Sequence, residues 1–203
     1  MSVEVVIARI AEINGMLAPP RAPAEAPPVT TTFGTALDQA TGAKGAAALG
    51  WAPAAGAGTA GQRMLAAAQA EVGQAEQPPG SNDSPRIAEY RTATAGSGIG
   101  PWCAYFVSWA ARQAGAPVGE QGQGFGSVAA LAAWGERTGR SLPAGSTPQP
   151  GDVIVWGGRH VGIVENVLPD GRIQTIEGNS SDRVARRTYG PDGGGATSYV
   201  RLG

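Results

Sequence analysis

Residues 100–109 read Gly-Pro-Trp-Cys-Ala-Tyr-Phe-Val-Ser-Trp, and the predicted fold is centred on this stretch. Proline is favoured in the first turn of a helix, because the N–H that it lacks is not needed there. Pro101 therefore predicts a helix that runs to about Ala114 and ends at Gly115, a residue type common after the last turn. The prediction places Cys103, the single cysteine of the 203-residue chain, in the first turn of that helix.

A cysteine at the start of a helix has a specific chemical advantage. The thiolate, not the thiol, is the nucleophile, and the backbone N–H groups of the first turn stabilise an anion. The same N–H groups can hold the oxyanion that forms when a carbonyl is attacked. Cys103 is therefore a candidate nucleophile for a hydrolytic enzyme.

Further helices are predicted on both sides of this stretch. Residues 63–74 carry apolar side chains at helical spacing. Ser84 can cap a short helix that runs through Tyr90, because a proline follows at its first position. Residues 127–138 form another helix with a serine cap. Together these patterns predict a helical first half of the domain.

Beyond Pro150 the pattern becomes that of strands. Pro169-Asp170-Gly171 indicates a tight turn between two of them. Helices first and hairpin-linked strands afterwards predict an α+β fold, in which an antiparallel sheet packs against the cysteine helix. The three clearest strand candidates and two weaker ones are residues 152–156, 161–168, 172–177, 183–189 and 197–202.

His160 is the single histidine and directly precedes one of these strands. An imidazole beside a thiol can accept its proton and later deliver it to the leaving amine. A third polar group is needed to fix the tautomer and ring angle. Glu177 and Asn179 stand two apart near the end of the next strand, and alternate residues of a strand share a face. We rank Glu177 as the orienting group and Asn179 as a secondary hydrogen-bonding residue, with the reverse order open.

Each of these residues also has a structural interpretation. A single cysteine on an apolar helix is most often a buried small hydrophobe. A histidine at the head of a strand is more often structural than catalytic, and Glu177 with Asn179 can be a polar strand end. The joint order of thiol, imidazole and polar residue favours catalysis. A fold that has kept its shape and lost its activity stays an alternative.

Composition excludes several classes of function. The formal net charge is −1, from 15 basic and 16 acidic residues, and no basic run predicts binding to nucleic acid or to an anionic membrane. No stretch approaches the roughly 20 apolar residues of a membrane span. One cysteine allows neither an intramolecular disulfide nor a cysteine-based metal site.

The first part of the chain differs from the rest in composition. Residues 1–18 place apolar side chains on one stripe, which predicts an amphipathic docking helix. Residues 19–61 are mostly Ala, Pro, Gly and Thr and lack the large side chains of a core, which predicts a flexible linker. Residues 62–203 are the predicted catalytic domain. The N-terminus has no early basic cluster, so we expect no standard secretory signal.

Residues 62–202 resemble the CHAP domain, the family of cysteine- and histidine-dependent amidohydrolases and peptidases. The resemblance implies a papain-like fold that cleaves amide bonds of bacterial peptidoglycan, as an N-acetylmuramoyl-L-alanine amidase or as an endopeptidase on stem or cross-bridge peptides. Each matching block alone is weak, but four blocks in order are specific. The blocks are residues 102–109, 150–154, 160–164 and 176–179.

The resemblance also implies roles for single residues. Cys103 is then the nucleophile, His160 the base and Glu177 the third member, with Asn179 in support. Trp102 and Trp156 stand nearest to these residues in sequence and are the tryptophans that we expect to line the substrate cleft.

Some members of this family bind calcium through an Asp-rich loop before the cysteine. Asn82-Asp83 is a poor match to such a loop, so we expect no metal and no cofactor.

The expected partner is the stem peptide of peptidoglycan, and the expected place of action is outside the cytoplasm. The N-terminal part is similar to the leader of actinobacterial flagellum-associated wall hydrolases, which would give residues 1–18 a flagellar protein as partner. The same features also fit a phage lysin, in which residues 1–18 would have a phage structure as partner. An acyltransferase or isopeptidase on this fold, and an inactive wall-binding module, are the alternative functions.

Overall fold

The computed structural model of the chain describes residues 58–96 and 98–203. The predicted docking helix 1–18 and nearly all of the predicted linker 19–61 lie outside the described residues, and both stay predictions. In the described part of the chain, no helix is both long enough and apolar enough to cross a membrane.

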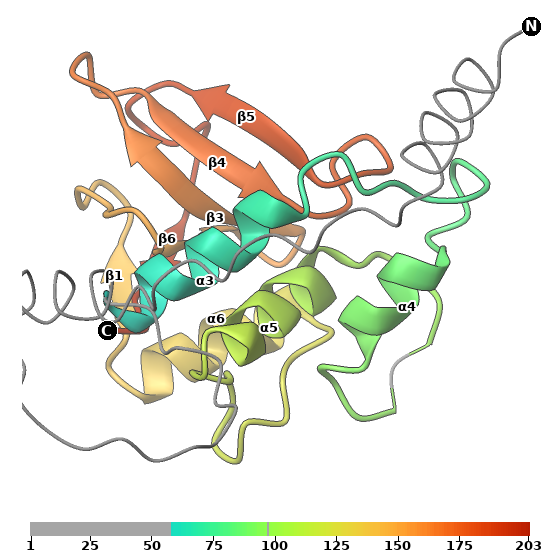
Figure 1. The fold of residues 1–203 in the computed structure, drawn as a ribbon. Coiled ribbons are helices and arrows are strands. Elements are labelled where there is room, and N and C mark those ends of the chain that lie inside the picture. The colour runs from blue at the N-terminus through green and yellow to red at the C-terminus, as the bar shows by residue number, and fades with distance from the viewer. Residues whose placement is uncertain (1–57, 97) are drawn as a thin grey trace, which may run out of the picture. The chain divides into compact units, whose positions relative to one another are not determined.

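Helices come first in the described residues, as predicted (Figure 1). They are α3 (Ala60–Ala70), α4 (Pro85–Arg91), α5 (Cys103–Gln113) and α6 (Val128–Arg137). The side chains of the predicted caps Ser84 and Ser127 accept hydrogen bonds from the N–H of the third residue of α4 and of α6, Ile87 and Ala130. Helix α3 begins three residues before the predicted position, because Thr59 and Gln62 form a capping box at its start.

Six strands form one antiparallel sheet in the order β1-β6-β2-β3-β4-β5. The predicted α+β class is confirmed, and all five predicted strands are present. Strand β1 was not predicted, because its three residues include a proline and lie at the sheet edge, where a missing N–H is tolerated. The strands are β1 (Ser141–Pro143), β2 (Val153–Trp156), β3 (His160–Val167), β4 (Ile173–Glu177), β5 (Ala185–Tyr189) and β6 (Ser198–Val200).

Helix α5 is the central helix and contacts α3, α4, α6 and β3. In Figure 1 it runs between α4 and α6, on one side of the sheet. An aromatic cluster of Tyr90, Trp102, Phe106 and Trp109 surrounds its first two turns, with ring centroids 5.0 to 6.4 Å apart. Burial of such a side chain contributes roughly 1.5–3 kcal/mol. The start of α5 is thus anchored in the main core.

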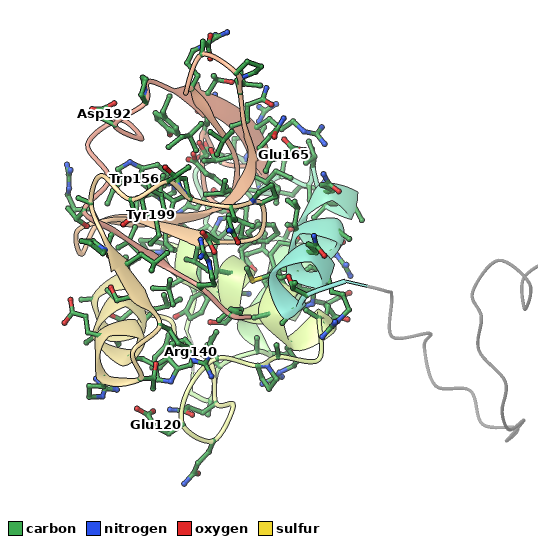
Figure 2. The ribbon with its side chains drawn as sticks, turned by 90° about the vertical axis from the view of Figure 1, so that its left-hand side faces the viewer. Glu120, Arg140, Trp156, Glu165, Asp192 and Tyr199 are labelled. Carbon is green, nitrogen blue, oxygen red and sulfur yellow. The ribbon has the colours of Figure 1, made fainter. Side chains whose placement is uncertain are left out.

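Each face of the sheet carries its own apolar cluster. Alternation along β2 sends Val155 to the main core with the helices, and Ile154 and Trp156 to a smaller cluster on the other face. In Figure 2, Trp156 lies beside Tyr199 of β6, which belongs to the same smaller cluster.

A buried ion pair holds the start of β2. The carboxylate of Asp152 accepts two hydrogen bonds from the Arg201 guanidinium, at 2.8 and 2.7 Å, and one from the N–H of Gln149. Asp152 stands at the end of β2 that is opposite to Trp156. The ion pair therefore stabilises the sheet at the end of β2 that lies away from Trp156.

Candidate active site

Cys103 is the first residue of α5, and its side chain is buried except for a small exposed fraction of 4%. The first hydrogen bond of the helix joins the N–H of Phe106 to the carbonyl of Trp102, at 2.9 Å. The N–H groups of residues 103–105 therefore have no acceptor within the helix. Trp102, the N-cap residue, makes no side-chain cap bond to them among the described residues. These N–H groups face the environment of the thiol and favour a negative charge there.

His160 is the first residue of β3 and pairs with Trp156, the last residue of β2, across the turn. The two rings stack, with centroids 5.4 Å apart and planes 25° from parallel. The Trp156 indole N–H donates to the carbonyl of Gly193 at 2.8 Å, which fixes the indole itself. A fixed indole thus holds the plane of the imidazole.

Glu177 ends β4, next to β3 in the sheet, and is almost completely buried. Its Oε2 lies 2.9 Å from Nε2 of His160, and its Oε1 accepts from the Thr175 hydroxyl at 2.6 Å. The Tyr189 hydroxyl is a third donor to this carboxylate. Burial opposes ionisation, but the hydrogen bonds from His160, Thr175 and Tyr189 outweigh it, so the pKa of Glu177 lies below its ordinary value. Glu177 is a carboxylate at neutral pH.

The His160 ring joins the carboxylate to the thiol. An ionised Glu177 only accepts hydrogen bonds, so Nε2 carries a proton and Nδ1 is the ring nitrogen left for Cys103. Burial disfavours the imidazolium. The hydrogen bonds and charges of Cys103 and Glu177 favour it more strongly, and the pKa of His160 is raised to about 9. The three side chains from α5, β3 and β4 thus form one continuous chain of interactions.

Asn179 occupies a different place from the one expected. Strand β4 ends at Glu177, and Asn179 has a backbone φ of +57°, so the alternation that would put both side chains on one face no longer applies. Its amide oxygen accepts from the Trp102 backbone N–H and its amide nitrogen donates to Glu76, both at 3.2 Å. The amide orientation is assigned from these partners. Asn179 therefore contacts the residue before Cys103, where we had expected it beside the imidazole.

The expectation that Trp102 lines the cleft is wrong. Its side chain is completely buried, and its indole N–H donates to Oε1 of Glu76 at 2.9 Å. As the N-cap residue of α5, it packs into the aromatic cluster, stacked on Tyr90. Trp156 does lie beside the site, with its ring against His160. Contact of Trp156 with a substrate stays a prediction.

Three residues of the site escaped the sequence analysis. Thr175 stands two positions before Glu177 in β4, so the alternation of the strand could have placed it on the same face. Tyr189 comes from β5, whose register against β4 is not visible in the sequence. Glu76 lies between α3 and α4, in a segment without periodic pattern, and no sequence signal points to it.

Two glycines allow elements of the site to approach closely. A Cβ on Gly162 of β3 would lie 2.7 Å from Cγ of Glu177, closer than such atoms pack. A Cβ on Gly178 would lie 2.6 Å from Cβ of Phe106 in α5. The first glycine makes room for the carboxylate, and the second lets the end of β4 reach the cysteine helix. Both explain why glycine stands in the blocks at 160–164 and 176–179.

Residues 94–179 match the CHAP domain family. The matched region contains Cys103, His160, Glu177 and Asn179, and the match is to the same family as the resemblance in the sequence predicted. Among solved structures, the peptidoglycan hydrolase RipB from Mycobacterium tuberculosis is similar to this chain, with 19% sequence identity and a TM-score of 0.43. The likeness covers 83% of this chain and 78% of that chain. No curated protein matches the chain.

Proposed function

We propose that this protein is a peptidoglycan hydrolase that cleaves amide bonds of the bacterial cell wall with Cys103 as its nucleophile. The observation that carries the proposal is the position of His160, which interacts with Cys103 on one side and with the buried carboxylate of Glu177 on the other. The match of residues 94–179 to the CHAP domain family supports the same chemistry.

In the first step the Cys103 thiolate attacks the carbonyl carbon of the scissile amide, and a carbon–sulfur bond forms while the carbonyl electron pair moves to oxygen. The N–H groups at the start of α5 are the candidate donors to this oxyanion. The His160 imidazolium then protonates the leaving nitrogen, and the carbon–nitrogen bond breaks. An amine leaves, and a thioester remains on Cys103.

In the second step water replaces the amine. Neutral His160 accepts a proton from the water as the oxygen attacks the thioester carbon, and the carbon–sulfur bond then breaks. The thiolate and the imidazolium are restored. Throughout, Glu177 keeps the proton of the ring on Nε2 and stabilises the imidazolium.

The substrate class is the stem peptide of peptidoglycan, either at its amide link to the muramoyl sugar or at a peptide bond within the stem or cross-bridge. Because peptidoglycan lies outside the cytoplasm, the protein acts there. The flagellar and phage contexts depend on residues 1–18, which lie outside the described residues, and both stay predictions.

Mass spectrometry of purified peptidoglycan tests this function. We expect digestion by the wild-type protein to release fragments with new amine termini, and digestion by Cys103→Ala to release none. The masses of the fragments identify which of the two kinds of amide bond is cut. Equal release of these fragments by Cys103→Ala would refute the assignment of the nucleophile.

A further inference from the structure

We propose that Glu76 is a positioning residue of the thiol site, which acts on Cys103 by holding the residue before it. Glu76 is 97% buried, since only 3% of its surface is exposed, and it lies in the segment between α3 and α4. The catalytic consequence of this role rests on the function proposed above. Its effect on the thiol can be measured without that function.

Every oxygen of the Glu76 carboxylate is used. Oε1 accepts from the Trp102 indole N–H at 2.9 Å and from the Asn179 amide at 3.2 Å. Oε2 accepts from the backbone N–H of Asn82 at 2.7 Å. The backbone N–H of Glu76 donates to the carbonyl of Asp182 at 2.9 Å, which ties the segment to the loop after β4. The carboxylate is thus held in place from both sides.

These contacts converge on the residue that precedes Cys103. Glu76 binds the side chain of Trp102, and Asn179, itself held by Glu76, accepts from the backbone N–H of Trp102. We call these three residues the Glu76 clamp. Trp102 is the N-cap residue of α5 and makes no side-chain cap bond of its own among the described residues. The clamp therefore holds the N-terminal end of α5, where Cys103 is the first residue.

Loss of the carboxylate would leave three donors without their acceptor at a site where water has little access: the Trp102 indole, the Asn179 amide and the backbone N–H of Asn82. An unsatisfied buried donor is costly, so the side chains would rearrange. Trp102 is bonded directly to Cys103, and a shift there moves the sulfur relative to His160. Misplacement by about 1 Å can lower a rate by about 10²-fold.

A matched pair of variants separates hydrogen bonding from charge and packing. Glu76→Gln keeps one oxygen that can accept from Trp102 and Asn179, whereas Glu76→Met has a similar length and no comparable acceptor. Both variants lose the bond from the Asn82 N–H, since the second oxygen becomes an NH2 group in Gln. Both remove the negative charge, so a difference between them reports on the hydrogen bonds. We expect alkylation of Cys103 by iodoacetamide at pH 7 to be within about threefold of wild type for Gln and about tenfold slower or more for Met. The turnover number on peptidoglycan should fall in the same order, with little change in KM.

Asp152→Asn is the control, because Asp152 is also a buried carboxylate but holds Arg201 at the far end of β2. It should lower thermal stability and leave the alkylation rate unchanged. Asn179→Gly gives a second test if Glu76→Met does not fold, because glycine suits the φ of +57° and removes only the amide. Its alkylation should also be slower than that of wild type.

Equal rates for Glu76→Gln and Glu76→Met, with Asn179→Gly at the wild-type rate, would overturn the proposal. So would an equal loss in Asp152→Asn, because the effect would then be one of general stability. If wild-type protein leaves peptidoglycan intact while the alkylation rates follow the expected order, the positioning role stands and the proposed function fails.

Discussion

Oε2 of Glu177 lies 2.9 Å from Nε2 of His160, and the Glu177 side chain is almost completely buried in the sheet. The contact joins the end of β4 to the start of β3 and leaves the other ring nitrogen for Cys103. A buried charge is costly unless it is paired and hydrogen-bonded. Here Thr175 and Tyr189 supply the additional hydrogen bonds, and the imidazolium supplies the opposite charge.

Replacement of Glu177 by glutamine should remove this charge while it keeps the shape of the side chain. We expect the turnover number of Glu177→Gln on soluble peptidoglycan fragments to fall on the order of 10²–10⁴-fold, with a smaller effect on KM, as for the loss of the orienting carboxylate in other catalytic triads. Glu165→Gln is the control, because Glu165 lies in the same strand as His160 and pairs with Arg186 in a partly exposed ion pair. Activity of Glu177→Gln close to that of Glu165→Gln would contradict the role of Glu177.

The pKa of His160 can be measured directly, because the chain has one histidine. An NMR titration should give a pKa of about 9, well above the ordinary value of about 6.5. Because the hydrogen bond and charge of Cys103 raise this value, Cys103→Ala should lower it. A wild-type value near 6.5, or no change in Cys103→Ala, would show that the thiol and the imidazole do not interact.

The raised pKa of His160 also predicts how stability depends on pH. The folded state binds the proton of His160 more tightly than the unfolded chain does, so its contribution is complete below about pH 6.5 and is lost as the pH rises through about 9. The free energy of unfolding in urea should therefore fall by on the order of 2 kcal/mol across this window. His160→Gln should lack this part of the pH dependence. The same slope in both proteins would argue against the shifted pKa.

Alanine at Gly162 should disturb the site by steric contact alone. Its Cβ would lie 2.7 Å from Cγ of Glu177. The backbone of Gly162 is not in the left-handed region, so alanine can adopt its φ without strain. We expect hydrolysis by Gly162→Ala to be about tenfold slower or more, because the carboxylate must shift away from His160. Gly158→Ala is the matched control, since its Cβ would make an ordinary contact of 3.7 Å with Ala129. Equal activity of the two variants would refute this role of Gly162.

Removal of the Tyr189 hydroxyl should change the pH profile of the reaction. The hydroxyl lowers the pKa of Glu177 by a hydrogen bond, so Tyr189→Phe should raise that pKa. The acidic limb of the kcat profile should then move to higher pH, while kcat at neutral pH changes little, because Glu177 stays ionised there. An unshifted acidic limb would mean that Tyr189 does not support the ionised form of Glu177.

The starts of α4 and α6 were predictable because their signals are local. Ser84 and Ser127 cap helices through their own neighbours, so a short stretch of sequence contains the whole interaction. Strand β1 lacks such a signal and exists only through pairing with β6, nearly 60 positions away in the chain. The same contrast holds in the site: Glu177 follows a recognisable strand, whereas Glu76 has its place through partners at residues 82, 102 and 179.

The sequence by itself determined the order of the helices and of five of the six strands in the described residues, and the single thiol and imidazole. These depend on local backbone preference and on side-chain chemistry. Only the tertiary structure decided that Trp102 is buried and that Asn179 turns to Trp102 and Glu76. Burial and hydrogen-bond partners depend on which surfaces meet, and contacts between α5, the segment before α4 and the loop after β4 set them together.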